Sequence, residues 1–389
     1  MSLAKTCLDV FLTSLHFANV GYMAALSEFQ MIELIAKAAR SSQKGVPSVG
    51  RSGGAVQRRG LSGKLRGSEP ERVLLGIGDD AAVLQVGGER LVVSVDACGE
   101  GVHFERNWLG FADLGFKATQ AALSDLAAMG AQPLGFTSAL MLPEGLERRE
   151  LSALVRGQVQ AGKGIGCPLI GGNIARSKAF SITTTVLGTV SRIVPRSGAR
   201  IGDEVWLIGS VGMAALGLEL LRRASSASKL RARRSPGGSV VAWSSSDPFE
   251  RRAVQAWRRP KALISEGERL VSYAHALIDV SDGLGQDVGH IAAASGVKLV
   301  LDEVQLRATC PRQYAAQCKK LQLDPLRLCL NGGEDYALVA TGPHGKKPAF
   351  ARIIGVVEAG RGTWLRREDG KLQPIGTGGF EHFSGRLDT

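Results

Sequence analysis

Helix-like and strand-like runs are mixed along the whole chain, and this mixture limits the fold class more than any other feature of the sequence. Residues 110–131 and 146–164 carry apolar side chains at helical spacing, whereas 180–190 and 297–306 are β-branched or apolar runs typical of strands. The glycines of 167–172 are expected to lead into a turn. Because the runs do not alternate as strict βαβ units, the order predicts an α+β fold built on sheets.

The length of the chain predicts two domains. A chain of 389 residues with 44% apolar residues can bury a sizeable core, and its length exceeds that of most single domains. We predict an N-terminal extension over 1–26, an N-terminal α+β sheet domain over 27–192 and a C-terminal α/β sandwich domain over 193–389. Asp9 interrupts the apolar extension, which lacks the ~18 continuous apolar residues of a membrane span. We expect an extension ahead of a start nearer Met23 rather than a signal peptide.

The positive charge is concentrated in two segments. Residues 41–67 contain six basic residues and no acidic residue, and residues 222–259 contain ten basic and two acidic residues. Since the net charge is +12, the rest of the chain is slightly acidic. The two segments are also rich in Ser and Gly, so we predict flexible basic insertions over 41–67 and 224–259. Solvated loops explain them better than contacts with an anionic partner.

The cysteines suggest neither a zinc ribbon nor a disulfide framework. No CxxC pair occurs among the six, which are Cys7, Cys98, Cys167, Cys310, Cys318 and Cys329. Scattered cysteines of this kind are typical of a reducing compartment, so we expect a cytoplasmic protein.

Two glycine-rich segments imitate nucleotide-binding loops but lack their physical requirements. Residues 157–164 (GQVQAGKG) have Gly164 where a phosphate loop needs a Ser or Thr to hold magnesium, and the surrounding pattern is helical. Residues 76–81 (GIGDDA) precede a strand rather than a helix, so no positive helix end would face a pyrophosphate there. We predict that neither segment binds a nucleotide in these ways.

A series of acidic and polar residues stands beside glycines at the ends of expected strands and helices. Its members are Asp80, Asp96, Glu100, His103, Asp125, Asp279, Ser281, Asp282, Asp287, Glu334 and Asp335. Capping or a turn explains each one alone. Together they favour another explanation, because carboxylates share a pocket at neutral pH only when a cation joins them. Oxygen ligands suit Mg²⁺ completed by substrate phosphates, so the series predicts a phosphoryl-transfer site with several magnesium ions.

Seven ordered motifs resemble those of the thiamine-monophosphate kinase family, in the superfamily that includes aminoimidazole ribonucleotide synthetase. They are GIGDDAAVL, SVDACGEGVHF, LGFKATQAALSDLAAMGA, RSGARIGDEVWLIG, IDVSDGLGQDVGHIA, GGEDY and GFEHF. The resemblance runs from about Phe29 to Phe383 and is broken at the basic insertions. It implies a two-domain synthetase-like fold, a homodimer, and ATP-dependent phosphorylation of thiamine monophosphate to thiamine diphosphate.

The implied reaction explains why the sequence offers many acids but no convincing Ser/His/Asp set. The γ-phosphoryl group of ATP would pass to the phosphate of thiamine monophosphate, whose attacking oxygen is already ionised at neutral pH. Direct in-line transfer of this kind needs positioning and metal ions that screen the repulsion between two polyanions. We therefore expect ATP as co-substrate, several Mg²⁺ ions and no general base.

The resemblance also implies roles for individual residues. The implied magnesium ligands are Asp80, Ser94, Asp96, Asp125, Asp279 and Asp282. The implied ATP contacts are Gly172, Asn173, Arg196 and Ser281, and the implied substrate contacts are His103, Glu334 and Phe380. Asp79, beside Asp80, is expected to shape the turn.

Two positions depart from the family pattern. Asn173 stands where the family usually has an aspartate that binds magnesium near ATP, and Val95 stands where it usually has a threonine. An Asn offers a carbonyl oxygen but no charge, which leaves three consequences open: weaker metal binding, a slower enzyme or an altered nucleotide preference. We expect activity to be retained, because the other implied carboxylates and Arg196 are present.

Three alternatives remain open from the sequence. One is another ATP-using enzyme of the superfamily, although this chain ends SGRLDT, without the terminal cysteine of hydrogenase-maturation relatives, and lacks the reactive loop of selenophosphate synthetases. A second is a weakly active or non-catalytic regulatory protein on the same fold, prompted by Asn173 and Val95. A third is nucleic-acid binding through the basic insertions, which only their charge favours.

Overall fold

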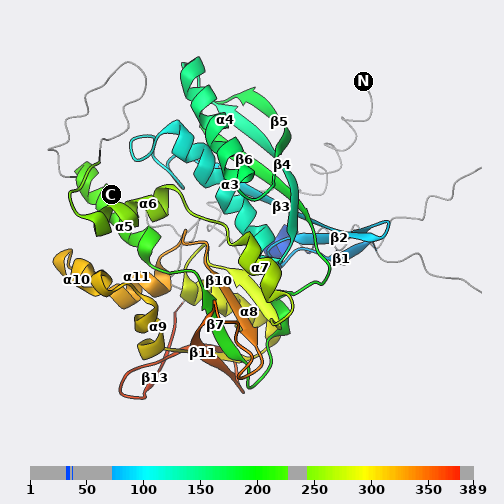
Figure 1. Cartoon of the computed structure of the whole chain (residues 1–389), viewed down its shortest axis with the longest axis vertical. Helices are drawn as coiled ribbons and strands as arrows, with labels where there is room; N and C mark the ends of the chain where they lie inside the picture. The colour runs from blue at the N-terminus through cyan, green and yellow to red at the C-terminus, as the bar shows by residue number, and fades with distance from the viewer. Residues whose placement is uncertain (1–31, 36, 38–71, 227–242, 377–389) are drawn as a thin grey trace, which may run out of the picture. The chain divides into compact units, whose positions relative to one another are not determined.

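The fold is known from a computed structural model, which describes residues 32–35, 37, 72–226 and 243–376 and is drawn in colour in Figure 1. The chain forms two compact units, residues 1–63 with 381–389 and residues 64–380. In the first unit, residues 32–35 and 37 are helical. The elements below all belong to the second unit. The predicted extension and the insertion over 41–67 lie outside the described residues.

Six strands form the first sheet, in the order β1-β2-β3-β6-β4-β5. They are β1 (Val73–Leu75), β2 (Ala82–Val86), β3 (Glu89–Gly99), β4 (Gln132–Leu142), β5 (Leu169–Arg176) and β6 (Ser181–Thr189). Neighbouring strands are antiparallel except β4 and β5, which are parallel. Buried and half-buried positions alternate along β6, as expected for a sheet with only one face covered.

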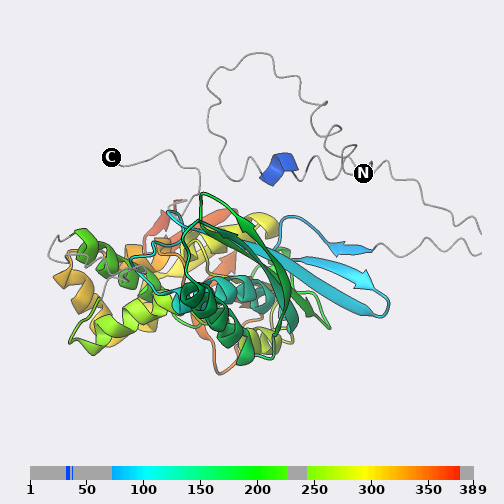
Figure 2. The ribbon, with the colours of Figure 1, turned by 90° about the horizontal axis from the view of Figure 1, so that it is seen from above.

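Helices α3 (Phe111–Ala128) and α4 (Arg148–Lys163) lie on the same side of this sheet (Figure 2). Their backbones approach closely, because a Cβ at Gly115 would lie 2.1 Å from the carbonyl oxygen of Leu154. A larger residue at this crossing would force the two helices apart. Residues 157–163 lie inside α4, which confirms that the GQVQAGKG segment is no phosphate loop.

The opposite face of the six-stranded sheet is not covered by any described element. Alternation along β3 directs Ser94 and Asp96 toward α3 and leaves Val95 60% exposed on the uncovered face. The strand register places Asn173 of β5 on the same face as Val95. Both departures from the family pattern therefore lie on the face opposite to Ser94 and Asp96.

Seven strands form the second sheet, in the order β13-β12-β9-β11-β7-β10-β8. They are β7 (Glu204–Ile208), β8 (Ala276–Asp279), β9 (Lys298–Asp302), β10 (Leu338–Gly342), β11 (Arg352–Glu358), β12 (Gly362–Arg366) and β13 (Leu372–Pro374). Only β9 and β12 are parallel neighbours. Strands β7, β8 and β10 are buried at every position, so this part of the sheet is covered on both faces.

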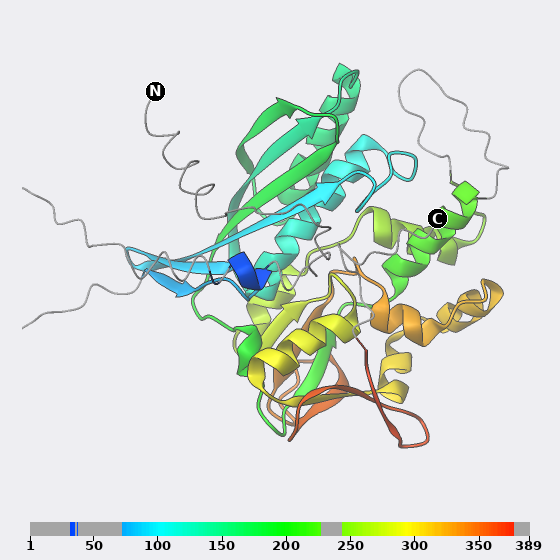
Figure 3. The same ribbon diagram turned by 180° about the vertical axis from the view of Figure 1, so that it is seen from behind.

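The second half of the chain also forms helices among the described residues. They are α5 (Met213–Ser226), α6 (Pro248–Arg258), α7 (Ile264–Leu270), α8 (Leu284–Ser295), α9 (Glu303–Thr309), α10 (Arg312–Lys320) and α11 (Pro325–Asn331), and a 3-10 helix, η1, spans Arg196–Gly198. Helix α8 packs against β8, β9 and β12 (Figure 3), and α7 packs against α3. No described helix has both the length and the apolar character that crossing a membrane requires.

These elements confirm the predicted fold class, a mixed α+β fold with two sheets. The predicted domain boundary at 192/193 falls between the two sheets and stays a prediction. Two local expectations were wrong. Residues 169–176 form the edge strand β5 rather than a turn, because β4 pairs with them in parallel. The strand expected over 297–306 ends at Asp302, whose side chain accepts a hydrogen bond from Gln305 N and begins α9.

The prediction of a flexible insertion over 224–259 was wrong at both ends of that segment. Helix α5 continues to Ser226, and residues 248–258 form α6. The side chain of Asp247 caps α6 by accepting a hydrogen bond from Phe249 N, and Pro248 occupies the first turn. Helix α6 contains three arginines, but Phe249, Ala253 and Trp257 lie four residues apart and form a buried stripe.

Helix α6 packs closely on α5. A Cβ at Gly217 of α5 would lie 2.1 Å from the carbonyl oxygen of Ala253, so the two backbones touch at this point. The helix pair is therefore part of the packed core, and residues 227–242 between them lie outside the described residues.

Candidate active site

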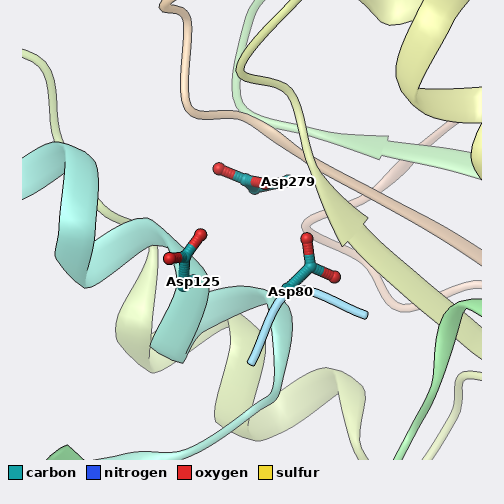
Figure 4. Close-up of side chains that lie close together, drawn as sticks. All are labelled: Asp80, Asp125 and Asp279. Atoms are coloured by element: carbon teal, nitrogen blue, oxygen red, sulfur yellow. The ribbon is translucent and has the colours of Figure 1, made fainter. Parts of the chain in front are cut away.

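Three aspartates from distant parts of the sequence meet at one point (Figure 4). Asp80 follows a turn before β2, Asp125 lies near the end of α3, and Asp279 is the last residue of β8. One carboxylate oxygen of each lies within 4.8 Å of those of the other two. Asp80 and Asp279 are buried and Asp125 is half-buried. The structure thus brings together three of the six implied magnesium ligands, which we call the aspartate cluster.

The turn before β2 presents Asp80 to the cluster. Gly78 has φ +120°, a conformation that residues with side chains rarely adopt, so this glycine permits the turn. Oδ1 of Asp79 accepts a 3.0 Å hydrogen bond from Asp80 N, and Oδ2 accepts one of 3.1 Å from Arg196 N. Asp79 therefore shapes the turn, as the sequence predicts.

Two serine hydroxyls hold the other two carboxylates. Ser94 of β3 donates a 2.5 Å hydrogen bond to Oδ2 of Asp125, and Ser124 of α3 donates one of 2.6 Å to Oδ2 of Asp279. Each hydroxyl fixes one oxygen of its partner and leaves the second oxygen with capacity to bind a cation. Ser94 is thus placed to orient the carboxylate of Asp125.

Arg196 of η1 binds Asp80 with both arms of its guanidinium group. Its Nη2 lies 2.6 Å from Oδ1 of Asp80, and its Nε lies 3.2 Å from Oδ2. A bidentate pair of this kind has a fixed geometry, so the positive charge of Arg196 is held beside the aspartate cluster.

Burial and mutual repulsion raise the pKa values of Asp125 and Asp279. Burial, followed by the charge of Asp80, raises the pKa of Asp279 to about 7. Burial, followed by the charges of Asp279 and Asp96, raises the pKa of Asp125 well above its usual range. The carboxylates therefore resist simultaneous ionisation until a cation joins them.

The donor set of the cluster fits a hard divalent cation. All of its ligand atoms are carboxylate oxygens, and no His or Cys joins the group among the described residues. Mg²⁺ prefers such ligands, whereas zinc and copper select nitrogen and sulfur. Asp96 and Asp282 lie near enough that their charges contribute to the raised pKa values of Asp125 and Asp279, after burial.

The IDVSDG segment between β8 and α8 is folded around Asp287. Oδ2 of Asp287 accepts 3.1 Å hydrogen bonds from Ser281 N and Gly283 N. Asp282 is held separately, because its Oδ2 accepts a 3.2 Å hydrogen bond from Gln286 Nε2. Asp287 has a structural role, and it fixes the backbone that carries Ser281 and Asp282.

Glu334, an implied substrate contact, makes two strong interactions. Its Oε1 lies 2.7 Å from Nζ of Lys117, and its Oε2 accepts a hydrogen bond from Trp257 Nε1. The backbone at Glu334 has φ +64°, a left-handed conformation that is uncommon outside glycine, and its N donates to the carbonyl of Ser281.

The other implied contacts lie elsewhere. His103 follows β3, and its Nδ1 accepts a 3.1 Å hydrogen bond from Gly99 N. Asn173 is exposed on β5 and outside the aspartate cluster, and its Oδ1 accepts a hydrogen bond from Ile174 N. Gly172 packs against the backbone of Ser138, since a Cβ there would lie 2.0 Å from its carbonyl oxygen. Phe380 lies outside the described residues.

Sequence reasoning gave no role to Ser124, Lys117 or Trp257. Ser124 directly precedes Asp125 in the LSDLAAMGA motif, but a single serine in a helical pattern gives no sign of its tertiary partner. Lys117 offered a stronger signal, because a single lysine within an apolar helical face is costly unless it is paired. Trp257 lay in the segment assigned to a flexible insertion.

Known proteins resemble this chain over most of its length. Residues 78–190 match the family model of the AIR synthase related protein, N-terminal domain. The thiamine-monophosphate kinase of Aquifex aeolicus is 34% identical over 310 residues, which cover 79% of this chain and 92% of the relative. That of Mycobacterium tuberculosis (strain H37Rv) is 34% identical over 294 residues, 74% of this chain and 80% of the relative.

A solved structure matches as well. AaThiL complexed with AMPPCP and TMP superposes with a TM-score of 0.75 at 30% identity, covering 94% of this chain and 100% of that one. The match extends through both sheets, so it is not limited to the segment that the family model covers. The ordered motifs, the two-sheet fold and these similarities agree, and the chain belongs to the thiamine-monophosphate kinase family.

Proposed function

We propose that this protein catalyses the ATP-dependent phosphorylation of thiamine monophosphate to thiamine diphosphate. The observation that carries the proposal is the aspartate cluster with Arg196 held against it, in a chain that belongs to the thiamine-monophosphate kinase family. The relative AaThiL, in complex with AMPPCP and TMP, supports both co-substrates. No feature of the described residues favours a different enzyme of the superfamily.

Magnesium is part of this proposal. Asp80, Asp125 and Asp279 would hold Mg²⁺, with Ser94, Asp96 and Asp282 as further ligands. Bound there, the metal ions would screen the charge of the phosphates and align them for in-line transfer. The serine hydroxyls keep the carboxylates in place, so little reorganisation is needed when the cation binds.

The chain's own groups position the two substrates. Arg196 and Ser281, with Gly172 and Asn173, are assigned to ATP, and Arg196 supplies a fixed positive charge for a phosphate group. His103, Glu334 and Phe380 are assigned to thiamine monophosphate. No residue removes a proton, because the attacking phosphate oxygen is already ionised.

The two departures from the family pattern are compatible with activity. Asn173 and Val95 lie on the sheet face opposite to Ser94 and Asp96, so their replacement leaves the aspartate cluster intact. These departures suggested a non-catalytic regulatory role, but the carboxylates of the aspartate cluster are all present and do not favour that role.

The proposal extends to a homodimer in the cytoplasm. Val95 and Met141 are 60% and 39% exposed on the uncovered sheet face, and exposed apolar side chains of this kind favour a partner surface. A second copy of this chain is the partner that family membership favours. Cys98, Cys167, Cys318 and Cys329 are buried free thiols, which supports a reducing compartment.

A phosphotransfer assay tests the proposed activity. Purified protein with ATP, MgCl₂ and thiamine monophosphate is expected to form thiamine diphosphate, measured by chromatography. Asp279→Asn removes a charge from the cluster and is expected to lower kcat at least about 100-fold. Asp369→Asn, at an exposed loop carboxylate, is the matched control and is expected to keep full activity.

Two outcomes would contradict the proposal. Nucleotide binding without any product would favour the regulatory alternative. An inactive wild-type protein that gains activity through Asn173→Asp would show that the missing carboxylate is essential.

A further inference from the structure

Lys117 is a buried cation at the junction of three elements. It lies on α3 with a relative exposure of 1%, and its Nζ is 2.7 Å from Oε1 of Glu334. The same Nζ donates a 3.1 Å hydrogen bond to the carbonyl of Trp257 and lies 4.2 Å from the centre of the indole ring. Burying an ammonium group is costly unless its charge is matched, and Glu334 supplies the match.

Trp257 completes the environment of Glu334. Its Nε1 donates to Oε2 of Glu334, so each oxygen of this carboxylate has a donor from a different helix. Trp257 is itself fixed, because it is 1% exposed and Trp108 packs edge-on against it at 5.9 Å. The carboxylate of Glu334 therefore has its position and its charge set by α3 and α6 together.

The backbone of Glu334 requires such support. A left-handed conformation at a non-glycine residue is strained and persists only where its surroundings enforce it. Yet the side chain of Glu334 remains 22% exposed, so it is not sealed into the core. A carboxylate that is held on both oxygens but still reaches solvent suits an acceptor for a donor group on a ligand.

We infer that Lys117 and Trp257 are positioning residues that hold the carboxylate of Glu334 directed toward thiamine monophosphate. The inference rests on the proposed function, in which Glu334 contacts this substrate. The group recognised would be a hydrogen-bond donor, such as an amino group on the substrate. Helix α6, within the segment whose composition predicts a flexible insertion, thereby contributes to the substrate side of the site.

A double-mutant cycle tests this inference. Lys117→Met is expected to raise KM for thiamine monophosphate about tenfold or more, because Glu334 loses its partner and its direction, while KM for ATP changes less than about twofold. In a Glu334→Gln background, Lys117→Met is expected to add less than about twofold, since both variants disturb the same contact. Trp257→Phe keeps the ring but removes the N–H donor, so a smaller increase of about threefold is expected.

Lys298 provides a matched control. Its Nζ lies 3.0 Å from Oε2 of Glu358 and 5.4 Å from the ring centre of Trp364. Lys298→Met therefore removes, on β9, an ion pair and a ring contact of the same kind as those of Lys117. This variant is expected to leave both KM values unchanged. Thermal unfolding of every variant separates folding from positioning. Lys117→Arg keeps the charge but places a larger group at a buried site, so it is expected to raise KM for thiamine monophosphate less than Lys117→Met does.

The outcomes separate this inference from the proposed function. A wild-type protein that makes no thiamine diphosphate would overturn the proposed function. If the wild type is active, three results would overturn the positioning role alone. Lys117→Met and Trp257→Phe could leave KM for thiamine monophosphate unchanged, or they could raise the KM values for both substrates equally. The effect of Lys117→Met could also add fully to that of Glu334→Gln. If Lys117→Met fails to fold, Trp257→Phe and Lys117→Arg decide the matter by the same two KM values.

Discussion

Ser124 on α3 donates a 2.6 Å hydrogen bond to Asp279 on β8, a residue 155 positions away. Both residues are buried, so the contact joins the helix of the first sheet to an edge strand of the second. Burial and the charge of Asp80 raise the pKa of Asp279, and the Ser124 hydroxyl opposes them. This serine therefore favours the carboxylate form of Asp279 that binds a cation.

Replacing Ser124 with alanine is expected to lower the free energy of unfolding by about 1 to 3 kcal/mol, because one buried oxygen of Asp279 loses its donor. Urea unfolding followed by circular dichroism measures this change. Ser152→Ala, at an exposed serine of α4, is the control and is expected to change stability by less than about 0.5 kcal/mol. Equal losses in both variants would show that the Ser124 contact contributes nothing.

Magnesium is expected to stabilise the protein more at about pH 8 than at about pH 6. The pKa of Asp279 rises from 3.8 to about 7 through burial and then the charge of Asp80, so the folded protein binds this proton more tightly than the unfolded chain. Through this group, the free energy of unfolding without metal falls as the pH rises from the unfolded pKa of 3.8 through the folded pKa of about 7. Mg²⁺ binds the ionised form, so its effect grows across the same window.

Thermal unfolding midpoints with MgCl₂ or with EDTA, measured across this pH range, check this prediction. Asp279→Asn is expected to remove most of the dependence of the magnesium effect on pH, because the titrating group is gone. A magnesium-induced shift of the same size at every pH would rule out Asp279 as the group that controls binding.

Asn173→Asp is expected to lower KM for ATP about threefold to tenfold, because it restores a charge where the family usually has a carboxylate. Since Asn173 is exposed on β5, the free energy of unfolding is expected to change by less than about 0.5 kcal/mol. Steady-state kinetics at saturating thiamine monophosphate measure the KM. Gln373→Glu, at an exposed position of β13, is the control and is expected to leave KM for ATP unchanged. An unchanged KM for ATP in Asn173→Asp would remove Asn173 from the ATP contacts.

The sequence predicted the parts of the site whose chemistry is visible in single residues. Asp80, Asp125 and Asp279 were identified as acids beside turns and helix ends, and the structure places their carboxylates together. Ser124 and Lys117 could not be assigned in this way. An apolar helical pattern is compatible with a serine or a lysine, and only the tertiary partners Asp279 and Glu334 give these two side chains a role.

The fold could be predicted where the apolar pattern was strong. The prediction was wrong where the composition of a segment concealed that pattern. Helix α3 and strand β6 lie where the periodicity placed them. Strand β5 was missed because its glycines signal a turn, whereas its pairing with β4 depends on a long-range contact. Helix α6 was missed because it lies within 222–259, a segment whose arginine-rich composition suggests a loop.

The close packing of α5 on α6 means that the chain can change in length between them at little cost. Because Gly217 lets the two helix backbones touch, their relative position is fixed by the core and not by the residues that connect them. Doubling the length of a connecting segment costs only about 0.6 kcal/mol of closure entropy. Shortening, lengthening or changing the charge of residues 227–242 is therefore expected to leave the contact between α5 and α6 intact.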